Sequence, residues 1–126
     1  NPKYLKTVLE KYSPKIILTH TGCYSALKPG LWLDEALDLG KQFENVYFDS
    51  SAASHVIYQK KVIERIRKNI GIERLLYGSD YPVVAGSNME YEVDIIKSSQ
   101  HLTGEEKNMI LGLNAAKLLA PPLYRP

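Results

Sequence analysis

Two residues that could do chemistry each close a short apolar run of the sequence. His20 ends the run 15–20, and Asp80 ends the run 74–80. An imidazole in such a place could bind a metal, exchange a proton or polarise a substrate carbonyl. A carboxylate suits zinc or a harder divalent metal, and it could also take a proton from a metal-bound water. The pair therefore predicts a site for acid–base or metal-assisted chemistry.

Each candidate also has a purely structural interpretation. A histidine at a strand end can be hydrogen-bonded without any chemical role, and an aspartate in the turn-rich segment 78–82 can cap the next loop. His55, after the second apolar run, could touch a substrate, although a histidine there is also typical of a surface. Cys23 lies close to His20 and could be either a reactive thiol or a buried inert one.

Three apolar runs, at 15–20, 45–51 and 74–80, must position these residues. Each run is apolar on both faces, which is typical of buried parallel strands. Each run ends in polar residues, namely Thr19 and His20, then Asp49, Ser50 and Ser51, then Ser79 and Asp80. Because the carboxyl ends of parallel strands share one edge of the sheet, we expect these groups to meet there. The alternative is that polar residues merely mark where each strand stops.

Helical patterns separate the runs. Apolar residues recur at helical spacing, and capping residues flank them, in segments at about 2–11, 31–42, 56–69, 89–98, 103–110 and 115–119. Gly71 is placed to end the third helix, Thr103 and Glu106 form a capping box, and Asn114 is a good N-cap for the last helix. The predicted strands start about 30 residues apart. This spacing predicts an α/β fold with parallel strands and right-handed crossovers.

Composition limits the class of protein. Sixteen basic and fourteen acidic residues give a net charge of +2, which favours neither a nucleic-acid partner nor a membrane partner. The lone Cys23 excludes an internal disulfide and fits a reducing cytoplasm. No apolar run approaches the roughly 20 residues that cross a bilayer. We expect residues 1–126 to form one cytoplasmic portion of a globular domain, and the start without methionine suggests a C-terminal fragment.

The order of these segments resembles the amidohydrolase-related family of metal-dependent hydrolases. That family has the TIM-barrel fold and includes aminocarboxymuconate semialdehyde decarboxylase. The similarity runs through segments 17–22, 45–51, 73–82 and 114–119, which span nearly the whole chain. Its specific part is Gly-Ser-Asp-Tyr-Pro at 78–82 together with Asn-Ala-Ala at 114–116.

The resemblance implies that the three strands are the sixth, seventh and eighth of a (β/α)8 barrel. The chain would be the C-terminal part, with about three βα units and the terminal helices. Asp80 would match the family's metal-binding aspartate, which also manages a proton. His20 would match a catalytic histidine that is a second-metal ligand in some members. The family's His-x-His and its histidine after the fifth strand have no counterpart here, and Cys23 stands where relatives often carry glycine.

The expected function is therefore hydrolysis of an amide, ester or lactone in a small-molecule substrate, with a divalent metal that we expect to be zinc. Non-oxidative decarboxylation is the alternative within the family, and a non-catalytic α/β binding module is the alternative from another class. Asp80 and His20 would be catalytic residues and metal ligands, and His55 would contact the substrate.

The chain alone is expected to bind zinc weakly and to be inactive, because a zinc site needs about three protein ligands. Open edges of a three-stranded sheet predict self-association or association with a missing N-terminal half.

Overall fold

The computed structural model of the chain describes residues 1–23, 28–83 and 88–120. Its centre is a parallel sheet in the order β1-β2-β3, as predicted. The strands are β1 (Ile16–Leu18), β2 (Val46–Asp49) and β3 (Leu75–Leu76). Leu18 pairs with Phe48, which pairs in turn with Leu75, so the strands are in register near their carboxyl ends.

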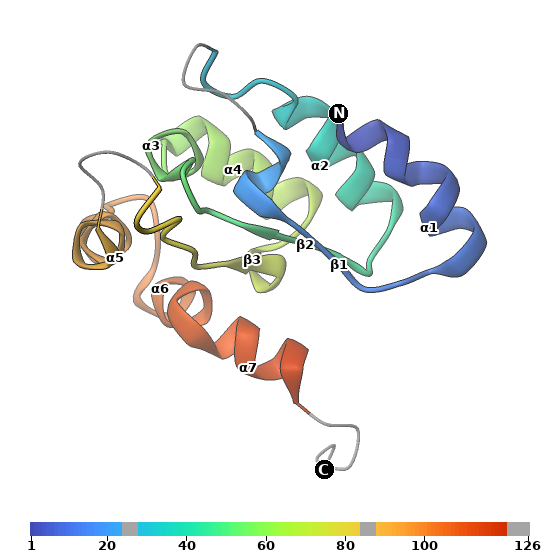
Figure 1. Ribbon diagram of the computed structural model, residues 1–126. Helices are drawn as coiled ribbons and strands as arrows, with labels where there is room; N and C mark the ends of the chain where they lie inside the picture. The colour runs from blue at the N-terminus through green and yellow to red at the C-terminus, as the bar shows by residue number, and fades with distance from the viewer. Residues whose placement is uncertain (24–27, 84–87, 121–126) are drawn as a thin grey trace.

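Helices flank this sheet (Figure 1). In that view α1 (Lys6–Tyr12), α2 (Leu33–Gln42) and α4 (Lys60–Asn69) lie above the sheet, and α6 (Gly104–Asn108) and α7 (Asn114–Leu119) lie below it. The remaining α-helices are α3 (Ser54–Ile57) and α5 (Met89–Ser98). Short helical turns cover Pro2–Leu5, Thr19–Gly22 and Ile72–Arg74, and a π-helical turn covers Met109–Leu113.

The helix predicted over 56–69 is wrong as a single element. The structure divides it into α3 and α4, with a break at Tyr58 and Gln59. Tyr58 is buried and Gln59 is extended, so the chain changes direction before the amphipathic α4 begins. Gly71 has a φ of 81° directly after α4, which confirms its predicted place at the end of that helix.

The predicted N-cap role of Asn114 is also wrong. Asn114 is the first residue of α7 rather than its N-cap, and Leu113 precedes it with helical dihedrals, after a kink at Gly112 in the π-helical turn. Asn114 is buried instead, and its side-chain amide donates to the carbonyl oxygens of Ile72 at 2.7 Å and Leu75 at 2.8 Å. This residue therefore fastens α7 to β3. The capping box of Thr103 and Glu106 is confirmed.

The core lies between the sheet and the helices above it. Phe48 of β2 is fully buried, and Ile63 and Ile66 of α4 are buried on the predicted stripe. Gly40 of α2 lets the helix approach the sheet, because a Cβ there would stand 2.7 Å from Ile70 Cγ2 and would also overlap the Phe48 ring. A residue with any side chain would push α2 away from β2.

The amino end of the sheet is held by one arginine. Arg74 Nη1 donates to the carbonyl oxygens of Gly40 and Phe43 at 2.8 and 2.9 Å, and Nε donates to Ile70 O at 2.8 Å. The end of α2, the entry to β2 and the end of α4 therefore share one cation. Burial lowers the pKa of Arg74 from its ordinary value. The planar guanidinium still presents several N–H donors, which suit the carbonyl oxygens at helix ends. No helix in the described ranges combines the length and apolar character that a bilayer crossing requires.

Candidate functional site

The carboxyl ends of the three strands bring the predicted site residues to one edge of the sheet. His20 comes two residues after β1, Asp49 closes β2, and Asp80 follows β3. Asp49 pairs with Leu76 in the parallel register, so the three exits leave the sheet side by side. The expectation that polar strand ends meet at a common edge holds for these segments.

His20 is tied to the exit of β2 by a compact set of hydrogen bonds. Its Nδ1 lies 2.8 Å from Ser51 O and 2.9 Å from Ser51 Oγ, and its backbone N–H donates to Asp49 Oδ1 at 2.8 Å. The side chain is half-buried. Its orientation is therefore set by the neighbouring strand exit, while its partner Ser51 is itself buried.

Asp49 is the hub of this set. Its Oδ1 accepts from the backbone N–H groups of His20 and Ser51, at 2.8 and 3.1 Å, and also from the Ser51 hydroxyl. The Thr21 hydroxyl donates to Asp49 O at 2.7 Å. The sequence places Asp49 and Ser51 at a strand end but does not identify them as partners of His20. The sequence feature that could indicate this contact is the set of polar residues that follows each of the two adjacent strands.

Non-glycine residues with left-handed backbone gather at these strand exits. The φ angles are 59° at His20, 52° at Thr21, 54° at Ala52 and 56° at Asp80. Such a conformation costs about 1–2 kcal/mol for each residue with a Cβ. It persists where surrounding contacts over-determine it, and it concentrates at ligand sites. The Asp49 hydrogen bonds supply that constraint for the turn after β1.

Asp80 reaches the same edge through a close approach of backbones. A Cβ at Gly78 would stand 2.9 Å from Ser51 Cβ, so the exit of β3 packs against the residue that contacts His20. Asp80 lies two residues further and is half-buried, and its carbonyl accepts from Val83 N–H at 2.8 Å. Ser51 is thus the link between the His20 and Asp80 segments. The catalytic and metal-binding roles of both residues stay predictions.

His55 and Cys23, the other two candidates, occupy different surroundings. His55 is the second residue of α3 and is exposed, and its predicted contact with a substrate remains a prediction. Cys23 is buried, and burial raises the pKa of its thiol to about 11. At neutral pH this thiol is protonated, so the inert interpretation of Cys23 is the better one.

Metal binding by these residues alone would be incomplete. Within residues 1–23, 28–83 and 88–120, no group of three or more histidine, cysteine, aspartate or glutamate side chains is arranged to hold a metal. The donor types of His20 and Asp80, an imidazole nitrogen and a carboxylate, nevertheless suit zinc or manganese. Further ligands would have to come from other residues.

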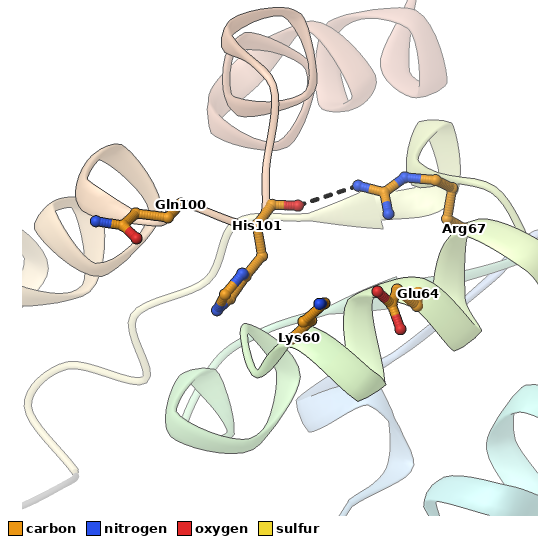
Figure 2. Close-up of a pocket in the computed structure, with 5 residues that line it drawn as sticks. All are labelled: Lys60, Glu64, Arg67, Gln100 and His101. Atoms are coloured by element: carbon orange, nitrogen blue, oxygen red, sulfur yellow. Dashed lines mark hydrogen bonds between the residues drawn. The ribbon is translucent and has the colours of Figure 1, made fainter.

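A separate polar pocket of about 310 Å³ lies on the helical layer (Figure 2). It is lined by Lys60, Glu64, Arg67, Gln100 and His101. Arg67 is engaged by Glu106 at 2.8 Å and donates to His101 O at 3.1 Å. None of these residues belongs to a strand exit. The pocket walls therefore join α4 to the segment before α6 and contribute nothing to the strand-end site.

Comparison with known proteins gives a consistent result. The sequence model of a family described as Amidohydrolase matches residues 1–120. No curated protein sequence matches the chain.

Solved structures with a similar fold include three decarboxylases. A dihydroxybenzoic acid decarboxylase from a Polaromonas species, with bound manganese and the inhibitor 2-nitroresorcinol, is 19% identical with a TM-score of 0.60, over 88% of this chain and 35% of that one. A 2,6-dihydroxybenzoate decarboxylase from Rhizobium is 18% identical with a TM-score of 0.61, over 88% and 36%. The 5-carboxyvanillate decarboxylase of Sphingomonas paucimobilis is 19% identical with a TM-score of 0.61, over 90% and 36%. The chain thus spans about a third of the length of these structures, as part of a TIM barrel would.

Proposed function

This chain belongs to the amidohydrolase family, and from that premise we propose that it forms part of the active site of a metal-dependent decarboxylase. The substrate class is a small aromatic carboxylate. The observation that carries the proposal is the meeting of His20, Asp49 and Ser51 at the carboxyl edge of the sheet, next to the segment that bears Asp80. Decarboxylases among the structural neighbours favour this reaction over the hydrolysis expected from sequence.

A divalent metal, zinc or manganese, would be held by Asp80 and His20 together with ligands from outside the described residues. When bound, it would polarise the carboxylate or a neighbouring hydroxyl of the substrate. The chain's own residues would orient that substrate and handle a proton. Asp80 supplies a carboxylate at the exit of β3, and the His20 ring is held in place by Ser51.

Decarboxylation breaks the bond between the ring carbon and the carboxylate. Carbon dioxide leaves, the electron pair stays on the ring carbon, and that carbon must receive one proton. Asp80, or His20 where its Nε2 is not bound to the metal, is the group at this edge that would deliver the proton. The half-buried positions of both residues limit the water that competes for it.

The test measures carbon dioxide release by the full-length protein from dihydroxybenzoates, with manganese or zinc added. We expect turnover that falls on the order of 10²–10⁴-fold in His20→Gln and Asp80→Asn. His101→Gln is the matched control, because His101 is exposed and lies in the separate pocket. Turnover that survives both substitutions would contradict the proposed site, and absence of turnover on both dihydroxybenzoates and hydrolysable substrates would favour a binding module.

Hydrolysis is the second candidate, and the description of the matching family supports it. In that reaction Asp80 would take the proton of the attacking water, and His20 would stabilise the developing charge. Assay of the same protein against amide, ester and lactone substrates separates the two reactions. Hydrolysis without release of carbon dioxide would replace the first proposal.

The sheet would be completed by strands from an N-terminal half. Ile17 of β1 is 45% exposed although it lies within a strand, and the match to the first structural neighbour covers only 35% of that chain. An uncovered apolar strand residue favours a covering partner. Co-expression of the N-terminal half with residues 1–126 should yield a one-to-one complex. A self-associated assembly of residues 1–126 that excludes the added half would indicate homo-oligomers instead.

A further inference from the structure

The strand-end network determines which nitrogen of His20 carries the proton. The Ser51 hydroxyl has a single proton, and it donates that proton to Asp49 Oδ1. The hydroxyl can therefore only accept from His20 Nδ1, which lies 2.9 Å away. The Ser51 carbonyl oxygen, 2.8 Å from the same nitrogen, is also an acceptor. Two acceptors facing one ring nitrogen require that this nitrogen bears a hydrogen.

We propose that Asp49 is a positioning residue that acts through the Ser51 hydroxyl, fixing His20 as the Nδ1–H tautomer and presenting Nε2 to the substrate or metal. A neutral imidazole carries one N–H, so the lone pair then resides on Nε2. The hydrogen bonds that the described residues make to the His20 ring are to Nδ1. The catalytic meaning of the tautomer rests on the proposed function, whereas the tautomer itself does not.

Asp49 is suited to this task because one carboxylate oxygen serves both neighbouring turns. The oxygen that receives the Ser51 hydroxyl also receives the backbone N–H groups of His20 and Ser51. Asp49 Oδ1 thereby fixes both the backbone of His20 and the Ser51 hydroxyl that accepts from the His20 ring. Hydrogen bonds to an ionised acceptor are shorter and stronger than neutral ones, so the Ser51 proton is committed to Asp49.

Loss of the carboxylate should release the hydroxyl proton. In Asp49→Ala, the Ser51 hydroxyl is free to donate to Nδ1, which competes with the carbonyl acceptor and favours the Nε2–H tautomer. In Ser51→Ala, only the carbonyl acceptor remains, so Nδ1–H persists. In the double variant, Nδ1–H returns because the competing donor is gone. If Asp49 acts through Ser51, which we call the relay, the tautomer of His20 should depend on Asp49 only when the Ser51 hydroxyl is present.

The experiment is two-bond ¹H–¹⁵N spectroscopy of the histidine rings in the full-length protein, with chelator present and at a pH where His20 is neutral. His20→Gln assigns the signal, and exposed His55 and His101 serve as internal references. We expect Nδ1–H to dominate at His20 in the natural protein. The tautomer ratio should change roughly fivefold or more in Asp49→Ala, the effect of about one hydrogen bond. Asp49→Asn, which keeps an oxygen for the two amides, should shift the ratio in the same direction by less.

Thr21→Val is the matched control for loosening of the turns. It removes the hydroxyl that donates to Asp49 O and leaves the carboxylate and Ser51 intact. An equal shift in Thr21→Val and Asp49→Ala would overturn the relay, and so would Nε2–H at His20 in the natural protein or an unchanged ratio in both Asp49 variants. Tautomers are read without turnover, so failure of the decarboxylase proposal leaves this result unaffected.

Discussion

Removal of the Asn114 side chain tests how α7 holds the exit of the sheet. Its amide donates two hydrogen bonds, to Ile72 O and Leu75 O, in a buried setting. Each of these hydrogen bonds contributes about 0.5–1.5 kcal/mol net, and Ile72 O keeps the Leu75 N–H as a second donor. The amide oxygen accepts no hydrogen bond from the described part of the chain, so its removal adds no further loss. Asn114→Ala should therefore destabilise the protein by about 2 kcal/mol.

Asn114→Asp should destabilise the protein more than Asn114→Ala does. A carboxylate cannot donate, and it would face two carbonyl oxygens, so we expect a loss of about 4 kcal/mol from a total of about 5–15. Urea unfolding of the full-length protein measures both losses as changes in midpoint at constant slope. Exposed Asn108 supplies the matched control, and Asn108→Ala should stay within about 0.5 kcal/mol. An Asn114→Ala value as small as that control would refute the proposed fastening.

Three further outcomes follow from single residues. Cys23 should resist alkylation at pH 8 and react only as pH approaches about 11, because burial raises its pKa; mass spectrometry of labelled protein measures this. The Arg67 hydrogen bond lowers the pKa of Glu106, so that carboxylate's contribution to stability is present above its unfolded value and is lost as pH falls through the lower folded one. Glu106→Gln should remove this part of the acid dependence of urea unfolding. Gly40→Ala should cost about 1–3 kcal/mol in the same assay, because the added methyl overlaps Phe48.

Each of these outcomes has its own control. Rapid labelling of Cys23 in folded protein at pH 8 would contradict its burial, and guanidinium-unfolded protein shows the ordinary rate. Exposed Glu105→Gln should leave the acid dependence unchanged. Gly104→Ala should be harmless, because a Cβ there meets no atom within 4 Å. Equal losses in the two glycine variants would disprove close packing as the cause.

The sequence predicts the parallel sheet because three runs are apolar on both faces and recur at even spacing. It overestimates the length of the third strand, which pairs only at Leu75 and Leu76. After Leu76 the chain leaves the sheet, since Tyr77 N–H donates to Ile110 O at 3.0 Å rather than to β2. The end of this strand is therefore set by a hydrogen bond to a later helical turn, and the local sequence does not predict that contact.

The candidate site is predictable in its location but not in its connections. Polar strand ends indicate the edge where His20 and Asp80 lie. The contact of His20 with Ser51 depends on the register of Leu18 against Phe48 and on a left-handed backbone at His20. A histidine with positive φ has no local sequence signal, because the Asp49 hydrogen bonds impose it from another segment. The predicted cap role of Asn114 fails for the same reason, because its amide donates to Ile72 O and Leu75 O in another segment.

Arg74 separates the part of the sheet that holds the scaffold together from the part that carries the candidate site. Its guanidinium gathers carbonyl oxygens at the amino end, away from the turns that carry His20 and Asp80. Substitutions in those turns should therefore leave the shape of the scaffold unchanged. An engineer who wishes to diversify this chain should randomise the turns and leave the arginine alone.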